Sequence, residues 1–211
     1  MKNINAIQMY FAGSRASSVI QGFKSEFVRK GIHFLIALTP ALAVLNRDFA
    51  VALLSSGIVF YSYLEWLRLS GIEVPFFSVI TRRASRPRDK DRFVLGPVTL
   101  GAGALLALLF LPETPAKIAI YALAFGDGFA SLIGRIFGRI RPAFLLGKSL
   151  EGSFSCFFSV LIASWYVCGD VKTSFVTAVS ATLCEALPLE DYDNIVIPLA
   201  AGIAAKLCLG L

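Results

Sequence analysis

Long apolar stretches, separated by short polar connections, run through most of the chain. Residues 93–111, 150–168 and 173–187 are apolar on all sides. A helix that crosses the hydrocarbon core of a bilayer needs roughly 20 predominantly apolar residues. The pattern therefore predicts helices that lie in a membrane, and it argues against an ordinary soluble domain.

Together, the apolar stretches predict an all-α fold: a polytopic integral membrane protein with about seven transmembrane helices. The first stretch is short for a full crossing, so we expect it either to begin earlier, around Phe27, or to lie tilted in a locally thin region. The predicted spans are residues 31–45, 49–67, 93–111, 115–133, 150–168, 173–187 and 195–211.

The chain before the first span has a different pattern. In residues 1–28 the apolar positions have helical spacing but are interrupted by polar ones, so no hydrophobic core of a cleavable signal forms. The spacing predicts an N-terminal segment that lies in the membrane interface, with a frayed tail as the alternative. Residues 29–211 are predicted to form a single transmembrane catalytic domain, because 211 residues leave room for one domain.

The composition agrees with a membrane-embedded chain. Hydrophobic residues make up 56% of it and charged residues 16%, whereas a soluble domain carries about 25% charged residues. The mean hydropathy is +0.72. The four cysteines lie in or at the ends of predicted spans and include no C-x-x-C pair, so we interpret them as packing residues and expect neither a disulfide framework nor a cysteine metal site.

Basic residues are distributed unevenly over the connections. Sixteen of the 20 Lys and Arg residues lie before the first span, after the second or after the fourth, whereas the alternate connections hold three. By the positive-inside rule, the N-terminus and the basic loops are cytoplasmic and Leu211 lies on the far side of an inner or cytoplasmic membrane. The loop at residues 81–92, with five arginines and a lysine, is interpreted as solvated; binding of anionic lipid or closure over a nucleotide are alternatives. No nucleic-acid partner is expected.

One carboxylate, Asp127, falls inside the fourth predicted span between Gly126 and Gly128. A charged side chain in the middle of a bilayer costs roughly 2.5–3.5 kcal/mol on insertion scales, so a charged residue at that depth usually has a functional role. The flanking glycines allow a ligand or another backbone to approach closely. Oxygen ligands of this kind suit Mg²⁺, which takes one or two carboxylates together with substrate phosphates. A helix-packing face is the alternative for the small residues that recur every fourth position: Gly126, Ala130, Gly134 and Gly138.

The fifth predicted span begins with a second group of polar residues. Lys148 and Glu151 are three residues apart, so they lie on one face of a helix. A helix N-terminus presents free backbone N–H groups that favour a phosphate, and Gly147 and Ser149 would help to form such a cradle. The alternative is an interfacial lysine with a first-turn glutamate that interacts with the helix dipole.

Near the end of the chain, a carboxylate inside the sixth span is followed by an acidic turn. Glu185 lies within the span, and residues 190–194 read Glu-Asp-Tyr-Asp-Asn. Asp193 and Asn194 can hold a metal ion or a hydroxyl at the mouth of a cavity. The alternative is a solvated turn in which Asp193 is the N-cap of the seventh helix.

The entrance of the first span carries a basic patch. Arg29, Lys30 and His33 are spaced by three or four residues, so they lie on one helical face, where they can bind phosphate. Membrane anchoring of the two long cations and a structural histidine are the alternatives. At the end of the second span, Glu65 and Arg68 are expected to form an i,i+3 ion pair.

Four segments, read together, resemble the CTP-dependent polyprenol, phytol and diacylglycerol kinase family, which includes dolichol kinase. They follow that family's order and cover nearly the whole chain. The segments are EFVRKGIH at residues 26–33, FGDG at 125–128 with Gly134 behind it, GKSLEG at 147–152, and EALP through DNIVIPL at 185–199.

The resemblance implies transfer of the CTP γ-phosphate, with a divalent metal, to the hydroxyl of a lipid alcohol: a polyprenol, a phytol-like alcohol or diacylglycerol. It also implies that Arg29, Lys30, Asp127 and Gly134 are essential. The family is related to phosphatidate cytidylyltransferase, but this chain lacks that enzyme's C-terminal signature with paired aspartates and a Gly-His-Gly core. The absence of that signature favours a kinase.

The hypothesis is therefore a membrane kinase with a cytoplasmic site. Asp127, together with Asp193 or Glu185, holds Mg²⁺ on the CTP phosphates, and either Glu151 or Glu185 orients or deprotonates the lipid hydroxyl. Lys148, Arg29 and Lys30 neutralise the phosphate oxygens.

Two other functions remain open from the sequence. One is a cytidylyltransferase that makes a CDP-lipid from the same nucleotide. The other is a small ion-coupled transporter in which Asp127 and Glu185 are the coupling carboxylates. The basic loops favour an anionic ligand, and no inverted repeat supports transport.

Overall fold

A computed structural model describes residues 26–72, 74–84, 89, 92–145 and 147–211, and within this part of the chain the secondary structure is entirely helical. The predicted all-α class is thus confirmed. Most of the predicted interfacial segment, residues 1–25, and half of the predicted basic loop, residues 85–88 and 90–91, lie outside the described residues.

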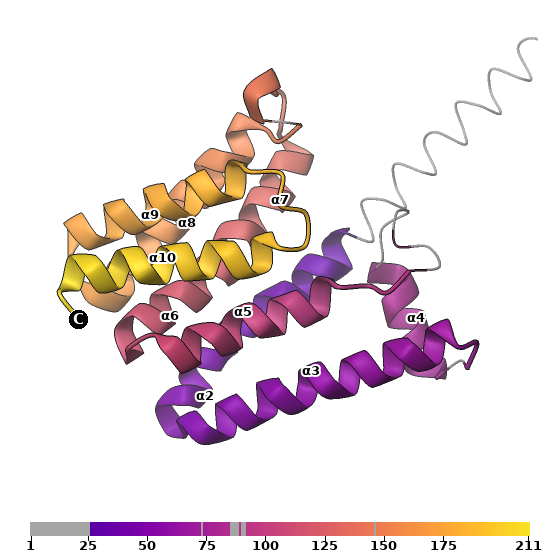
Figure 1. Cartoon of the computed structure of the whole chain (residues 1–211). Coiled ribbons are helices and arrows are strands. Elements are labelled where there is room, and N and C mark those ends of the chain that lie inside the picture. The colour runs from indigo at the N-terminus through magenta and orange to yellow at the C-terminus, as the bar shows by residue number, and fades with distance from the viewer. Residues whose placement is uncertain (1–25, 73, 85–88, 90–91, 146) are drawn as a thin grey trace, which may run out of the picture.

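The helices follow one another with short connections (Figure 1). Residues 26–35 are helical and lead into the 3₁₀ turn η1. The elements are η1 (Ile36–Leu38), α2 (Thr39–Leu45), α3 (Arg47–Leu69), α4 (Pro75–Ala84), α5 (Gly96–Phe110), α6 (Glu113–Tyr121), the π-helical segment η3 (Ala122–Asp127), α7 (Gly128–Ile136), η4 (Ala143–Leu145), α8 (Leu150–Cys168), α9 (Val171–Ala186) and α10 (Asp193–Leu209).

Capping side chains explain where several of these helices begin. Asn46 accepts a hydrogen bond from the backbone N–H of Phe49 at the start of α3, at 2.9 Å. Asp170 accepts one from Thr173 at the start of α9, at 2.7 Å. Each cap satisfies a backbone donor that has no partner within its own helix. Gly169, with φ at +67°, makes the left-handed turn that ends α8 and allows α9 to fold back beside it.

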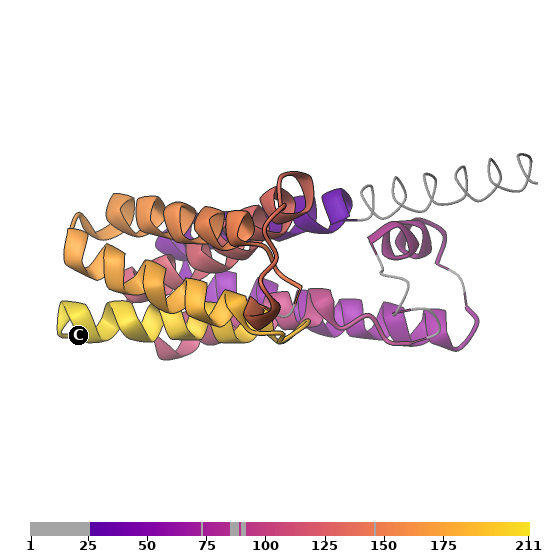
Figure 2. The ribbon, with the colours of Figure 1, turned by 90° about the horizontal axis from the view of Figure 1, so that it is seen from above.

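The segment from α6 through η3 to α7 occupies the centre of the fold. The central residues Ile118, Leu123 and Ala124 are fully buried. One side of this segment packs in an apolar cluster with α3 and α5, and the other packs with α8, α9 and α10. Figures 1 and 2 show α8, α9 and α10 side by side as one group, and Figure 1 shows α3 along the opposite edge of the molecule. The buried residues that precede Asp127 are therefore enclosed on both sides.

Each predicted span lies on a helical segment, but among the described residues only four segments have the length and composition of a membrane crossing. These four are Glu26–Leu45, Arg47–Leu69, Glu113–Ile136 and Leu150–Cys168. The first begins before residue 31, which is one of the two solutions expected for the short first stretch. The helices α5, α9 and α10 are apolar but have 15, 16 and 17 residues. The count of about seven crossings is not confirmed and stays a prediction.

The outward faces of the long helices are apolar, as expected for surfaces in lipid. On α3, Phe60 is 63% exposed and Trp66 is 58% exposed; on α8, Phe158 is 55% exposed and Trp165 is 57% exposed. Large exposed patches of this kind are rare on soluble monomers. The described part of the chain is thus that of a membrane protein.

The helix α4 was not predicted, because residues 75–84 are too few for a span and end in charged residues. The predicted loop at residues 81–92 therefore begins within a helix. Pro75 suits the first turn, where its missing N–H has no helical partner in any case. The ring of Phe77 packs on Tyr61 of α3 with centroids 5.4 Å apart, so α4 is held by tertiary contacts that local sequence does not reveal.

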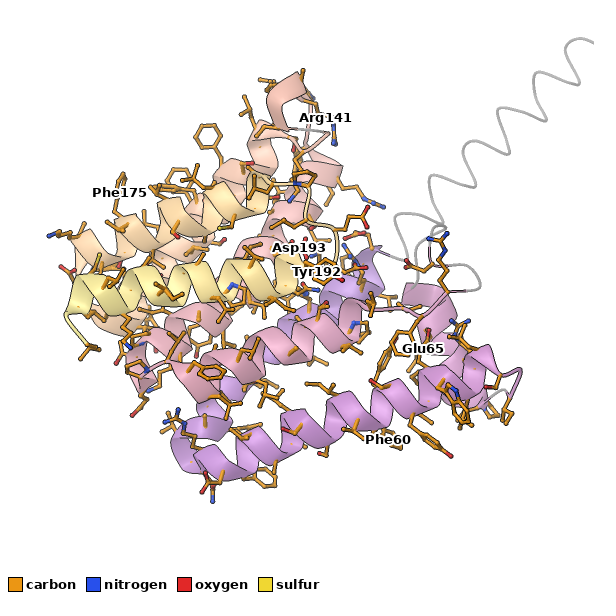
Figure 3. All side chains as sticks on the ribbon, in the orientation of Figure 1. Phe60, Glu65, Arg141, Phe175, Tyr192 and Asp193 are labelled. Carbon is orange, nitrogen blue, oxygen red and sulfur yellow. The ribbon has the colours of Figure 1, made fainter. Side chains whose placement is uncertain are left out.

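The predicted ion pair at the end of α3 is confirmed. Arg68 donates two hydrogen bonds to the fully buried Glu65, at 2.9 and 2.7 Å. Glu65 also accepts from the backbone N–H of Val94 at 2.9 Å, and Arg68 donates to the carbonyl of Arg92 at 2.8 Å. The pair therefore joins α3 to the chain that enters α5 (Glu65 is labelled in Figure 3).

Candidate active site

Asp127 ends the π-helical segment η3, at the boundary with α7, and is 3% exposed. Single π-helical turns within longer α-helices are frequent at functional sites. The two flanking glycines are required by packing. A Cβ atom on Gly126 would lie 2.8 Å from Val160 Cγ2, and one on Gly128 would lie 2.6 Å from Phe34 Cε1. The structure thus places both glycines against neighbouring helices, and their role in phosphate binding stays a prediction.

The predicted basic patch lies directly on Asp127. Lys30 forms a buried ion pair with Asp127 Oδ2, and His33 Nε2 lies 3.1 Å from the same oxygen. His33 Nε2 is also 2.8 Å from the carbonyl of Leu123. Since both neighbours of this nitrogen are acceptors, Nε2 carries a proton. The hydroxyl of Ser131 lies 3.4 Å from the other carboxylate oxygen, Asp127 Oδ1.

A second ion pair joins the beginning of α8 to the end of α9. Lys148 Nζ lies 3.1 Å from Glu185 Oε1, and it also donates to the backbone carbonyl of Glu185. Ser153, one turn into α8, donates to Glu185 Oε2 at 3.1 Å. Both oxygens of this 6% exposed carboxylate therefore have donors, which offset the cost of burying its charge.

Glu151 faces backbone groups. It accepts hydrogen bonds from the backbone N–H groups of Arg139, at 2.9 Å, and Ile140, at 3.1 Å. Arg141 in the same loop donates to the carbonyls of Gly134, at 2.9 Å, and Gly147, at 2.5 Å. These bonds fasten the α7–α8 loop onto the two helices that it connects. Glu151 does not line the pocket described next, and its catalytic role stays a prediction.

A pocket of about 410 Å³ opens between these groups. It brings together residues that are far apart in the sequence but were predicted from it: Arg29, Asp127, Gly134, Lys148, Ser149, Glu185 and Asp193. Further polar residues in its lining are Glu26, Ser131, Arg135, Arg141 and Glu190. Figure 3 shows Asp193 at the beginning of α10 and Arg141 on the loop that follows α7.

Asp193 is the first residue of α10, and Tyr192 occupies the N-cap position without a side-chain cap. The alternative interpretation of Asp193 as an N-cap is therefore wrong. Burial, reinforced by the nearby charge of Asp127, raises the pKa of Asp193 to about 7. A carboxyl in such surroundings is stabilised in its charged form by a cation.

Asn194 does not line the pocket, and it ties α10 to α5. Its side-chain amide donates to Thr99 Oγ1 at 2.9 Å and to the carbonyl of Gly96 at 3.3 Å. A Cβ on Gly103 would lie 1.9 Å from the backbone oxygen of Asn194, so the two helices are in close contact. The predicted phosphate contact of Asn194 stays a prediction, and so do those of Lys30 and His33, which contact Asp127 and do not line the pocket.

The donor set of the pocket suits magnesium. Asp127 and Asp193 line it together, and Mg²⁺ usually takes one or two carboxylates with substrate phosphates as further ligands. Within the described part of the chain, no group of three or more His, Cys, Asp or Glu side chains is arranged to hold a metal ion by itself. Two carboxylates are nevertheless enough for an ion that arrives with a nucleotide.

Sequence reasoning missed several residues of the pocket. Glu26 belongs to the quoted N-terminal segment but was given no role, and Arg135 and Arg141 were counted only as charges that set orientation. One signal was available for Glu26, because it lies three residues before Arg29 on a helix. Arg135 directly follows Gly134, a residue that the family resemblance had already marked.

The described fold and this pocket define a helical membrane protein with a buried, charged site. Its curated relatives are lipid alcohol kinases. The chain is 28% identical over 158 residues to a probable chloroplastic phytol kinase 1 of Oryza sativa subsp. japonica, with 66% of this chain and 50% of that protein covered. It is 27% identical over 226 residues to the chloroplastic phytol kinase 1 of Arabidopsis thaliana, with 97% of this chain and 73% of that protein covered. It is 29% identical over 199 residues to dolichol kinase of Saccharomyces cerevisiae, with 85% and 36% covered.

The chain is thus similar to phytol kinases and to a dolichol kinase, in agreement with the resemblance of the four motifs. It spans about half the length of the first of these relatives and about a third of the yeast protein. No family model matches the chain. No solved structure matches it either.

Proposed function

We propose that the chain is a CTP-dependent lipid alcohol kinase, which transfers the γ-phosphate of CTP to the hydroxyl of an isoprenoid alcohol. The pocket of about 410 Å³ carries this proposal, because it collects carboxylates and cations at one end of apolar helices. Catalysis of phosphoryl transfer depends mainly on positioning the two substrates and on neutralising the phosphate charge, and the pocket contains groups that can do both. The names of the relatives, phytol kinase and dolichol kinase, support an isoprenoid alcohol over diacylglycerol as acceptor.

In this proposal, the cations of the pocket bind the CTP phosphates. Lys148 precedes the first turn of α8, whose free backbone N–H groups favour an anion, and Glu185 holds its ammonium in place. Arg29 lines the same pocket from the N-terminal helix. Of these two cations, Lys148 is proposed to stabilise the negative charge that the transferred group carries in the transition state.

Magnesium is the proposed cofactor. Asp127 and Asp193 would hold it, and the phosphates of CTP would complete its ligands. When bound, the ion would neutralise charge on the phosphate oxygens. Asp127 Oδ2 is engaged by Lys30 and His33, whereas Oδ1 faces the Ser131 hydroxyl at 3.4 Å and keeps the capacity to accept a cation.

Glu185 is the proposed base. It lines the pocket, whereas Glu151 is occupied by the backbone amides of the α7–α8 loop. As the lipid oxygen bonds to the γ-phosphorus and CDP leaves, the hydroxyl proton passes to the Glu185 carboxylate. Lys148 and Ser153 hold that carboxylate in one orientation before the transfer.

The lipid chain is proposed to approach along an aromatic strip beside Asp127. Phe125 and Phe129 flank this aspartate in the sequence, with ring centroids 6.2 Å apart, and Phe34 of the N-terminal helix packs on Phe129 at 5.0 Å. Phe129 is 40% exposed, so the strip reaches the apolar surface of the molecule. An acceptor that stays in the bilayer can thus present its hydroxyl to a site at the end of the helices.

The membrane is proposed to be an inner or cytoplasmic membrane, with the pocket on the cytoplasmic side. The α7–α8 loop, which carries Arg139, Arg141 and Lys148, borders the pocket. The positive-inside rule assigns such a loop to the cytoplasm, where CTP is available.

Labelled CTP tests the proposed function. Purified protein in detergent, with Mg²⁺ and a panel containing phytol, a polyprenol and diacylglycerol, is expected to transfer label from γ-labelled CTP to an isoprenoid alcohol. Label from α-labelled CTP should stay in the water-soluble products. Transfer of the α-label to phosphatidate, added as a separate acceptor, would identify a cytidylyltransferase instead, and no transfer of the γ-label to any alcohol would contradict the kinase.

A further inference from the structure

Glu26 is a buried carboxylate that contacts two arginines from different helices. It is 5% exposed. It forms an ion pair with Arg29 one turn along the same helix, and its Oε2 lies 3.4 Å from a guanidinium nitrogen of Arg135 on α7. A carboxylate so deeply buried is stable only when paired, so both arginines contribute to holding it.

All three side chains line the pocket that also contains Asp127 and Asp193. Arg29 has a donor to spare, since its Nε is buried and has no hydrogen-bond partner among the described residues. A buried N–H without an acceptor is costly, and in a binding pocket it points to an acceptor that a ligand supplies. Because Glu26 holds one guanidinium nitrogen of Arg29, its Nε–H is oriented and can donate a hydrogen bond to a phosphate oxygen.

We propose that Glu26 is a positioning residue, which holds Arg29 and Arg135 as a two-arginine clamp for the polyphosphate of the nucleotide. This inference rests on the proposed function and deepens it, because it names how the pocket orders its cations. Two neighbouring guanidinium groups repel each other, and each long side chain loses conformational freedom when it binds a ligand. The carboxylate between them offsets the repulsion and fixes both side chains before the nucleotide arrives.

The clamp is proposed to contribute to binding of the polyphosphate and not to the chemical step. Lys148 supplies one cation from the start of α8, and the clamp supplies two more from the N-terminal helix and α7. Loss of the clamp should therefore weaken binding of the polyphosphate while leaving the chemical step to the carboxylates and Lys148. A purely structural Glu26 would instead affect stability and leave nucleotide affinity unchanged.

The test measures Mg²⁺–CTP and Mg²⁺–tripolyphosphate binding by titration calorimetry without lipid, and KM and kcat with lipid. Arg135→Gln is the primary variant, because the Arg135 side chain is 44% exposed and its replacement buries no unpaired charge. We expect about tenfold weaker binding of both ligands, with kcat within about twofold of wild type. Glu26→Gln should have a similar effect, and the double variant should be no weaker than the single ones.

Glu113→Gln is the matched control. Glu113 also pairs with a cation on its own helix, Lys117 at 2.6 Å, but it is exposed and lies outside the pocket lining. The Glu113→Gln variant should bind Mg²⁺–CTP and Mg²⁺–tripolyphosphate with the affinity of the wild type. Unchanged affinity and KM in Arg135→Gln would overturn the clamp, even if Glu26→Gln does not fold. Clamp-dependent binding of tripolyphosphate without any transfer to lipid would retain the clamp and remove the proposed kinase function.

Discussion

At the scale of single residues, the site consists of carboxylates that already have cations beside them. Asp127 is paired with Lys30, and Glu185 is paired with Lys148, so each charge is buried together with its counter-charge. Removing one partner of a buried pair is far more costly than removing an exposed charge, because the other charge remains without compensation. Asp127 is the metal ligand in the proposed function, and its pairing with Lys30 leaves the second carboxylate oxygen, Oδ1, for that role.

Asp127→Asn is therefore expected to remove phosphoryl transfer and to lower stability. Activity at saturating Mg²⁺ should fall by on the order of a hundredfold or more, since the proposed metal ligand is lost. The melting temperature in detergent should also fall, because Lys30 is left buried opposite a neutral amide. Asp170→Asn serves as the control, since Asp170 caps α9 away from the pocket lining. Near wild-type turnover of Asp127→Asn would exclude this aspartate from the metal site.

At the scale of helices, the contact between α7 and α8 sets the width of the pocket. Gly134 and Gly152 face each other there: a Cβ on Gly152 would lie 2.8 Å from the carbonyl oxygen of Ala130 and 3.2 Å from the Cα of Gly134. Both obstacles are backbone atoms, which cannot move aside as the tip of a side chain can. The small residues at every fourth position of this segment thus form a helix-packing face. Because α7 and α8 approach each other closely there, Lys148 and Asp127 line the same pocket.

Gly152→Ala should separate these two helices. Overpacking of this kind costs about 1–3 kcal/mol, so we expect the melting temperature in detergent to fall by several degrees and CTP affinity to weaken. Gly57→Ala is the matched control, because Gly57 lies within α3 and a Cβ there has nothing within 4 Å. That variant should be neutral or up to about 1 kcal/mol more stable, as alanine favours a helix. Equal behaviour of the two variants would contradict a backbone-to-backbone contact at Gly152.

At the scale of the whole molecule, charge distribution and helix order together predict the orientation in the membrane. Two of the basic connections, the segment with Arg29 and the α7–α8 loop, border the pocket, and the long helices present apolar faces. An odd number of crossings would place the two termini on opposite sides. The short helices α5, α9 and α10 decide this number, since each has fewer residues than a full crossing usually requires.

We expect seven crossings, with Leu211 outside the cytoplasm and the α7–α8 loop inside it. A reporter fused after Leu211 should be active only on the outer side. A cysteine introduced at the exposed Arg139, in a variant without the four native cysteines, should react with an impermeant reagent only after the membrane is opened. A cytoplasmic reporter at the C-terminus would mean that one of the short helices does not cross.

The sequence by itself determined the class of fold and most members of the site. Continuous apolar stretches are a direct consequence of the membrane as solvent, so the all-helical fold and the positions of the main helices could be predicted. Charges in such stretches are costly, which is why Asp127 and Glu185 stood out without any structure. The family motifs added Arg29 and Gly134, and all four residues line one pocket.

Only the tertiary structure decided how these residues are partnered. Local spacing cannot show that Lys30 reaches Asp127, or that Glu185 faces Lys148, because each pair joins helices far apart in the chain. It also could not place Glu26 between Arg29 and Arg135, or turn Glu151 toward the backbone of the loop. Those choices depend on which helix faces pack together, and backbone contacts at glycines such as Gly152 set that packing.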